Sequence, residues 1–217
     1  MDLDALLPGL PGLPGLPGLP GLPGLPGVRG TVVVTRTPAG TPADTPADTP
    51  VRPHERDRAA AHALARRLVG EVTGRPAPPL AHRCPTCGSS GHGRPSVPGA
   101  PDVHVSLAHA GGWVAAVVAD VPCGVDVEPL RPLEAPPVAL TPGESAALAA
   151  TAPADRPAVF LTWWTRKEAA AKAGLLHIDD FDRYDARTPG AHVADVPVPA
   201  RSPAGSPGAV AAVAVRP

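Results

Sequence analysis

The chain has very little lysine. Of its 217 residues, 19 are lysine or arginine, and only Lys167 and Lys172 are lysines. Because nearly all other basic residues are arginines, the two lysines suggest a place where a compact ammonium is preferred to a planar guanidinium. On a helix, Trp164, Glu168 and Lys172 would share one face. That face is compatible with a site that holds a cation and a phosphate together, and also with a Glu–Lys pair on a solvated surface.

Aromatic residues are also scarce, at 3% of the chain. Four of the six lie between positions 160 and 181, so the aromatic core material is concentrated near the lysines. The formal net charge is −1. A chain with this balance lacks the clustered basic excess that general nucleic-acid binding requires, so we expect no nucleic-acid partner.

The sequence contains three cysteines and no long apolar run. An odd number of cysteines without a signal peptide favours a reducing compartment. The first residues are acidic and the next ones are interrupted by proline, unlike a secretory signal. No stretch approaches the ~20 apolar residues that cross a bilayer. We therefore expect a cytoplasmic protein with no membrane partner.

Proline is abundant instead, with 33 residues, and much of it lies in seven Leu-Pro-Gly repeats at 7–27. Proline at every third position excludes a helix or an inner strand. We interpret residues 1–27 as a disordered, low-complexity arm. A ligand for a proline-binding domain and a mis-assigned start codon are alternative explanations of the repeat.

The remaining sequence predicts mixed strands and helices. Alternating or β-branched patterns predict strands at 31–35, 103–107, 113–119, 123–128, 193–199 and 209–215. Apolar periodicity predicts helices at 54–72, 141–150 and 157–174. The elements do not alternate strictly, so the predicted fold class is α+β. We interpret 37–53 as a loop and 75–99 as irregular.

Two helix ends carry specific signals. Thr141, Pro142 and Glu144 supply an N-cap, a proline at the first helical position and an acid at the third. Gly174 is a plausible stop for the last helix.

The strand at 123–128 contains Gly-Val-Asp-Val-Glu. Residues two apart share a strand face, so Cys123, Val125 and Val127 would face the core, while Asp126 and Glu128 point the other way. Two carboxylates on one face repel each other unless a cation lies between them, and Mg²⁺ favours such oxygen ligands. Glu168 is a candidate third oxygen donor. An exposed face with two solvated acids is the alternative.

Two further motifs carry basic side chains. His109 follows a strand next to a glycine turn and could donate to a phosphate. Gly93-Arg94-Pro95 presents an arginine in a loop stiffened by proline, a candidate ligand for a terminal phosphate.

In this order, the motifs resemble those of 4′-phosphopantetheinyl transferases of the surfactin-synthetase-activating type. The matching segments are Gly-Arg-Pro at 93–95, Leu-Ala-His at 107–109, Gly-Val-Asp-Val-Glu at 124–128 and Trp-Thr-Arg-Lys-Glu-Ala-Ala-Ala-Lys at 164–172. The resemblance covers roughly residues 56–215. It implies transfer of phosphopantetheine from coenzyme A to a serine of an apo acyl or peptidyl carrier protein. It also implies two similar pseudo-symmetric halves, expected at 28–122 and 123–217, with the active site in the cleft between them.

The resemblance implies roles for individual residues. Asp126, Glu128 and Glu168 would hold Mg²⁺, and Lys172 would contact the phosphates and the leaving oxygen. Glu168 is also the candidate general base. The candidate ligands of coenzyme A, besides Lys172, are Arg56, Arg58, Arg94 and His109.

The sequence departs from the family pattern at Ala108, where a serine is usual. One hydroxyl contact to phosphate would therefore be missing. The proline-rich segment 129–141 also lacks an evident apolar patch for carrier docking. Two other functions remain open: a scaffold with a degenerate transferase fold, and a Mg²⁺-dependent phosphohydrolase that uses the same three acids.

A Cys-Pro-Thr-Cys-Gly segment lies at 84–88, with His82 and His92 nearby. Two cysteines and both histidines would complete a four-ligand zinc site. No second Cys-x-x-Cys exists, so we interpret the segment as a reduced, turn-rich loop and keep zinc as the alternative.

Overall fold

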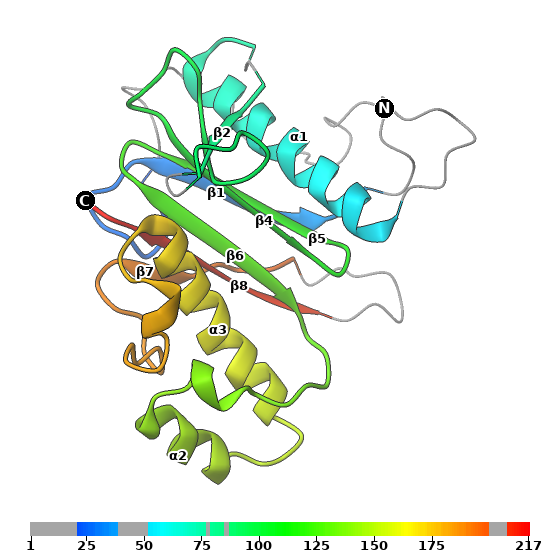
Figure 1. Ribbon diagram of the computed structural model, residues 1–217, viewed down its shortest axis with the longest axis vertical. Coiled ribbons are helices and arrows are strands. Elements are labelled where there is room, and N and C mark those ends of the chain that lie inside the picture. The colour runs from blue at the N-terminus through cyan, green and yellow to red at the C-terminus, as the bar shows by residue number, and fades with distance from the viewer. Residues whose placement is uncertain (1–20, 39–51, 77–78, 85–86, 200–207) are drawn as a thin grey trace.

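The computed structural model describes residues 21–38, 52–76, 79–84, 87–199 and 208–217. These residues form three α-helices, two three-stranded sheets and one small two-stranded sheet. Figure 1 shows the two longest helices, α1 and α3, on opposite sides of the strands. The mixture of helices and antiparallel strands agrees with the expected α+β class.

The first sheet has the order β1-β5-β4 and is antiparallel throughout. Its strands are β1 (Gly30–Arg36), β4 (His104–Ala110) and β5 (Trp113–Ala119). Helix α1 (Pro53–Thr73) covers one face. Asp57, near the start of α1, accepts hydrogen bonds from Thr37 Oγ1 (2.6 Å) and Gly112 N (2.9 Å). These bonds fix the N-terminal end of α1 on the sheet.

The second sheet has the order β6-β8-β7 and is also antiparallel. It consists of β6 (Cys123–Pro129), β7 (Val193–Asp195) and β8 (Ala209–Val215). Helix α3 (Arg156–Ala173) packs on one face of this sheet. The guanidinium of Arg166 joins α3 to β7 through two hydrogen bonds to Asp195, of 2.7 and 2.6 Å.

The two sheets pack against each other through their remaining faces. The side chains alternate along each strand, so that one set meets a helix and the other meets the opposite sheet. On β6, Cys123, Val125 and Val127 lie in the core between the sheets, as predicted. Strands β4 and β6 are joined by a hydrogen bond from Val125 N to Ser106 Oγ (3.3 Å). The result is a helix–sheet–sheet–helix arrangement.

Both halves use the same connectivity. In each, a strand is followed by the long helix and then by two strands, and the last strand lies at the centre of the sheet. The segments β1, α1, β4 and β5 correspond in this way to β6, α3, β7 and β8. The chain passes from one set to the other in the short turn between Ala119 and Cys123.

Smaller elements connect these layers. Strands β2 (Ala81–Arg83) and β3 (Arg94–Ser96) form a hairpin in the region predicted to be irregular. Between β6 and α3 lie a 3-10 turn, η3 (Pro137–Ala139), and helix α2 (Pro142–Ala150). A second 3-10 turn, η4 (Ile178–Asp180), follows α3. Among the described residues, no helix is both long and apolar enough to span a membrane.

The predicted helix signals are confirmed. Thr141 caps α2. Its hydroxyl accepts a hydrogen bond from Glu144 N at 3.1 Å, and its backbone N–H donates to the Glu144 carboxylate. Gly174 ends α3 with a positive φ of 82°, a conformation that favours glycine. Strand β7 is shorter than the predicted segment at 193–199.

The prediction of a disordered arm over residues 1–27 is wrong for its last repeats. Residues 1–20 lie outside the described part. In 21–27, Leu22 and Leu25 are 3% and 2% exposed and belong to the core between the sheets. The backbone turns back on itself, with Leu22 N donating to Val28 O at 3.0 Å. Within 21–27 the repeat forms no helix and no named strand, but Leu22 and Leu25 pack in the core between the two sheets.

Candidate functional site

The acidic strand β6 lies directly beneath helix α3. A Cβ atom at Gly124 would lie 2.1 Å from the carbonyl oxygen of Ala169 and 2.8 Å from Lys172 Cβ. Only glycine permits this approach of the two backbones. The close contact places Lys172, near the C-terminal end of α3, against Asp126 on β6. The acids therefore face a helix, and the alternative of two solvated acids is incorrect for Asp126, which is only 7% exposed.

Asp126 and Lys172 form the centre of the site. Lys172 Nζ donates to Asp126 Oδ1 at 2.6 Å and to the carbonyl oxygen of Val125 at 3.2 Å. The second carboxylate oxygen, Asp126 Oδ2, is buried and has no hydrogen-bond partner among the described residues. A buried oxygen without a partner is costly, so this atom is available to an additional ligand.

Glu128 and Glu168 surround this pair. Both are partly buried, Glu128 on β6 and Glu168 one turn before Lys172 on α3. Glu128 lies 3.7 Å from Arg131. Burial raises the pKa of Asp126, although Lys172 opposes the shift. Burial also raises the pKa of Glu128, with a further contribution from Asp126. The pKa of Glu168 is raised for the same reasons, again against the effect of Lys172.

The three acids fit a magnesium ion that also binds water and substrate. Their ligand atoms are more widely spaced than a closed protein cage requires, because the acids do not form a group within 4.8 Å among the described residues. Mg²⁺ commonly takes one or two carboxylates and keeps several waters or phosphate oxygens. The unpartnered Asp126 Oδ2 and the raised pKa values of all three acids are what such a cation would relieve.

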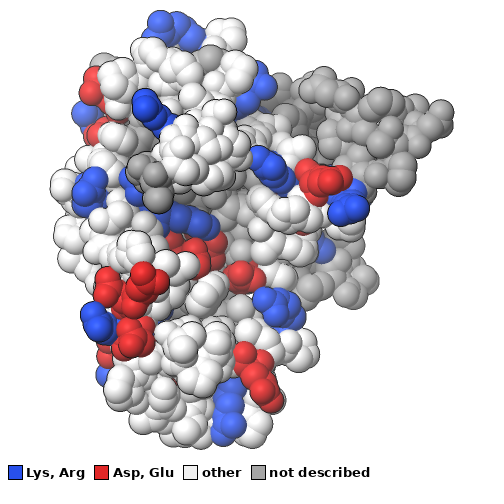
Figure 2. Space-filling model, viewed as in Figure 1, with Lys and Arg blue, Asp and Glu red and all other residues white. Residues whose placement is uncertain are grey.

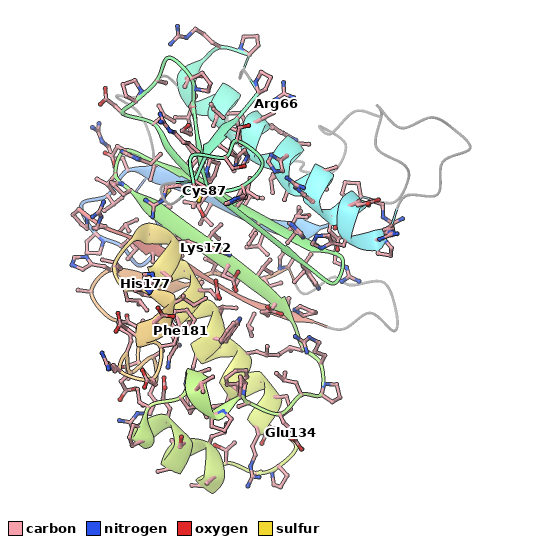
Figure 3. The ribbon with its side chains drawn as sticks, viewed as in Figure 1. Arg66, Cys87, Glu134, Lys172, His177 and Phe181 are labelled. Atoms are coloured by element: carbon pink, nitrogen blue, oxygen red, sulfur yellow. The ribbon has the colours of Figure 1, made fainter. Side chains whose placement is uncertain are left out.

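The charges of the site are visible from one side of the molecule. Figure 2 shows acidic and basic side chains next to one another near the middle of this face, with further charged side chains close by. Figure 3 shows Lys172 on α3 at the side of the helix that faces the first half. A small pocket of about 180 Å³ is lined by Glu128, Arg131 and Trp164, among others.

His109 lies on β4, close to the start of α1. Its ring centroid is 4.8 Å from that of His54. Burial lowers the pKa of His109, and the neighbouring His54 lowers it further, with smaller effects from Lys172 and Arg58. Asp57 acts in the opposite direction and raises the pKa of His109. The ring of His54 was not anticipated there, since only the fold brings position 54 beside position 109.

Arg56 and Arg58 lie in the first two turns of α1. Arg58 is exposed, whereas Arg56 is partly buried and its Nε has no hydrogen-bond partner among the described residues. Arg58 contributes to the lowered pKa of His109. The structure shows no contact between Arg56 and the acids.

Arg94 begins β3 and reaches the other half of the molecule. Its guanidinium donates to the carbonyl oxygen of Lys172 at 2.5 Å and lies next to Gly174. Arg216 is also close to Gly174. Arg94 and His104 line a cavity of about 240 Å³ with Cys123. The predicted arginine thus belongs to the site through α3, and sequence reasoning missed Arg216 beside it.

The other lysine has a structural role. Lys167 is 1% exposed and donates to Glu144 Oε2 (2.6 Å), Ala139 O (2.8 Å) and Phe181 O (2.6 Å). It therefore holds α2 and the segments around η3 and η4 against α3. Of the two lysines in the motif, Lys172 lies in the candidate site and Lys167 stabilises the fold.

Ala108, where the family has a serine, is buried in the core between the sheets. His109 next to it points to the opposite face of β4, as adjacent residues on a strand do. The expected loss of a phosphate contact at this position stays a prediction.

The matched segments support the predicted resemblance. Residues 122–194 match the model of the 4′-phosphopantetheinyl transferase superfamily. A 4′-phosphopantetheinyl transferase of Bacillus subtilis is 29% identical over 126 residues, which cover 54% of this chain and 56% of that protein. The 4′-phosphopantetheinyl transferase psf-1 of Bacillus pumilus is 39% identical over 46 residues, or 21% of this chain and 20% of that protein.

The predicted resemblance to phosphopantetheinyl transferases is thereby confirmed. The matches span little more than half the length of one curated relative and about a fifth of the other. The stretch matched by the family model includes Asp126, Glu128, Glu168 and Lys172.

Proposed function

We propose that this protein transfers 4′-phosphopantetheine from coenzyme A to a serine of an apo acyl or peptidyl carrier protein. The reaction would release adenosine 3′,5′-bisphosphate and require Mg²⁺. The observation that carries this proposal is the buried, unpartnered Asp126 Oδ2 beside Lys172. It lies in the segment that matches the transferase family.

The chemistry assigns a role to each side chain. The serine hydroxyl attacks the phosphorus that bears pantetheine, and the bond from that phosphorus to the 5′-phosphate oxygen breaks. In this proposal Glu168 takes the serine proton as general base. The Lys172 ammonium stabilises charge on the phosphates and on the leaving oxygen. Such transfers depend mainly on positioning and charge neutralisation.

Asp126, Glu128 and Glu168 would hold Mg²⁺ in this proposal. When bound, the ion neutralises negative charge on the pyrophosphate of coenzyme A. Lys172 already occupies Asp126 Oδ1, so Oδ2 is the oxygen of that residue left for the ion. The wide spacing of the acids leaves room for phosphate and water oxygens.

The nucleotide portion of coenzyme A would contact the basic residues of the first half. Arg58 and His109 lie together on that side of the acids, and Arg94 bonds to the end of α3. We include Arg56 because its partly buried Nε has no partner of its own among the described residues. His109, kept neutral near pH 7 by its lowered pKa, retains one N–H for a phosphate oxygen.

We further propose that residues 28–122 and 123–217 are two pseudo-symmetric halves with the active site between them. The repeated connectivity of the two sheets supports this division. The candidate residues come from both sides of it, with His109 and Arg94 from one and the acids and Lys172 from the other. A reducing, cytoplasmic location is part of the proposal, on the ground that the sequence has an odd number of cysteines.

The test is incubation of the protein with coenzyme A, Mg²⁺ and apo-carriers of fatty-acid, polyketide and peptide synthesis. Intact mass should show one phosphopantetheine added to at least one carrier, and chelation of Mg²⁺ should abolish the gain. A folded protein that modifies none of these carriers would contradict the proposal. Release of inorganic phosphate in place of transfer would support a phosphohydrolase instead.

A further inference from the structure

The loop between β2 and β3 is held by very few apolar contacts. Residues 84–93 consist mostly of glycine, serine and the two cysteines, and most of those described are exposed. Two backbone hydrogen bonds fold it back on itself: Gly88 N to Cys84 O and Cys84 N to Ser89 O, both 2.9 Å. Such a loop has little hydrophobic burial to offset the entropy of its ordering.

Three potential metal ligands converge in this loop. The ligand atoms of Cys84, Cys87 and His92 all lie within 4.8 Å of one another. Cys87 Sγ is 3.3 Å from His92 Nε2. In a tetrahedral zinc site, bonds of about 2.3 Å to sulfur and about 2.0 Å to nitrogen separate neighbouring ligand atoms by roughly 3.5–3.8 Å. Small side-chain rotations would bring these three atoms to that spacing.

The hairpin itself produces this convergence. Arg83 pairs with Arg94. Cys84, which follows β2, and His92, which precedes β3, therefore lie at the same end of the hairpin. Gly93 has a φ of 109°, and a Cβ there would lie 2.5 Å from Arg83 O and 2.7 Å from Cys84 N. Only glycine allows the two ends to meet so closely. Gly88 directly after Cys87 also has a positive φ, 71°, which completes the tight turn after the second cysteine.

We propose that Cys84, Cys87 and His92 bind one Zn²⁺ ion, with the fourth position taken by water. His82 does not belong to the group of ligand atoms that converge within 4.8 Å in the described structure, and its Nδ1 lies 3.1 Å from Gly93 O. Cys84 and Cys87 would supply the two thiolates. The binding releases their protons to solvent as the two thiolates coordinate the ion.

The ion would tie this loop to the candidate site. Arg94 follows the ligand His92 by two residues, and its guanidinium bonds to the last turn of α3 at Lys172. Figure 3 places Cys87 in this loop, drawn close to Lys172 in that view. Zinc would therefore fix the start of β3 and, through it, Arg94. The zinc proposal itself does not depend on the proposed transferase activity.

The test measures metal directly on the full chain without a histidine tag. The protein is reduced, reconstituted with zinc sulfate, freed of excess metal and analysed by elemental mass spectrometry. We expect about one zinc per chain, at least fivefold less in Cys87→Ser and His92→Ala, and no change in Cys123→Ala, whose cysteine is buried elsewhere. Cobalt substitution should give the visible absorption of tetrahedral thiolate coordination, which Cys84→Ser should lose.

Two results would overturn the proposal. One is wild-type protein that keeps no zinc after reconstitution, or Cys87→Ser that keeps as much as wild type. The other is a Cys84–Cys87 disulfide with no metal in protein isolated without reductant, which would assign a redox pair instead. Since the readout is bound metal, loss of transferase activity alone neither supports nor contradicts the zinc site.

Discussion

Asp126 is a residue whose burial is costly to the fold and whose carboxylate the proposed reaction would use. Its carboxylate is buried, pairs with Lys172 through one oxygen, and has a raised pKa because burial outweighs that pairing. A bound cation would satisfy the other oxygen. The same feature explains why we expect stability and activity to respond in opposite directions when this residue is changed.

We predict that Asp126→Asn lowers transfer activity by roughly 10²–10³-fold, the cost of removing one preorganised electrostatic contact. The variant should unfold at the wild-type temperature or slightly above it in the absence of Mg²⁺. Thermal unfolding with and without Mg²⁺ checks the reason, because the stabilisation by the ion should disappear. Glu134→Gln, at an exposed acid, is the control. Unfolding of Asp126→Asn at room temperature would show that the acid is structural.

The pH dependence of the free energy of unfolding should also reflect the raised pKa of Asp126. A carboxyl whose pKa is raised in the folded protein binds more protons there than in the unfolded chain, so its contribution to stability falls as pH rises between the two values. Several histidines have lowered pKa values and act in the opposite direction. The difference between Asp126→Asn and wild type removes their contribution. We predict that this difference increasingly favours the variant from about pH 4 upward. A flat difference would contradict the raised pKa.

Lys167 is the residue whose role the sequence could not reveal. It stands in the same motif as Lys172, five positions earlier, but faces the interior. We predict that Lys167→Met lowers the free energy of unfolding by about 3–5 kcal/mol, because Glu144 is left buried and unpaired. The double variant Lys167→Met/Glu144→Gln should regain part of this loss in urea unfolding. Equal losses in the single and double variants would show that the pair is not coupled.

At the scale of elements, the contact of β6 with α3 determines where the acids and Lys172 meet. Gly124 is the residue on which this contact depends. We predict that Gly124→Ala destabilises the protein by about 1–3 kcal/mol or more, because β6 and α3 must separate. For a chain of this size each kcal/mol lowers the melting temperature by about 2–4 °C.

Activity of Gly124→Ala should fall as well, since Lys172 moves away from Asp126. Gly190→Ala is a matched control, because a Cβ there has an ordinary contact at 3.6 Å and the backbone is unstrained. Wild-type melting and turnover for Gly124→Ala would mean that the two elements are less tightly packed than described.

Some elements of the structure were predicted from the sequence better than others. Alternation along 123–128 predicted which side chains face the core, and the helix limits at Thr141 and Gly174 followed from local capping chemistry. These features depend on neighbours in the chain. The β2–β3 hairpin was missed because three residues that include a proline carry almost no strand pattern. The approach of Arg94 and Arg216 to Gly174 depends on tertiary packing and has no local signal.

For the whole molecule, the repeated sheets leave a core between them that their own strands do not fill completely. Leu22, Leu25 and Val28 complete it. A Cβ at Gly24 would lie 2.9 Å from Ala194 Cβ, which places this segment against β7. The local pattern of the repeat gave no sign of this, since each repeat is identical and only its position relative to β1 decides which leucines are buried.

Leu22 and Leu25 belong to the folded protein, and two truncations test how much of the repeat it needs. Deletion of residues 2–20 keeps both buried leucines, and we predict that melting temperature and turnover match those of the full chain. Deletion of residues 2–27 opens the core where two buried leucines stood, and each leucine contributes about 1.5–3 kcal/mol. We predict a melting temperature lower by roughly 6–24 °C, using about 2–4 °C per kcal/mol. Leu22→Ala/Leu25→Ala in the full-length chain separates the loss of packing from the loss of chain and should be destabilised in the same direction. Equal melting of the two truncations would return residues 21–27 to the dispensable arm, whereas a loss already present on deletion of 2–20 would show that the folded protein needs earlier repeats as well.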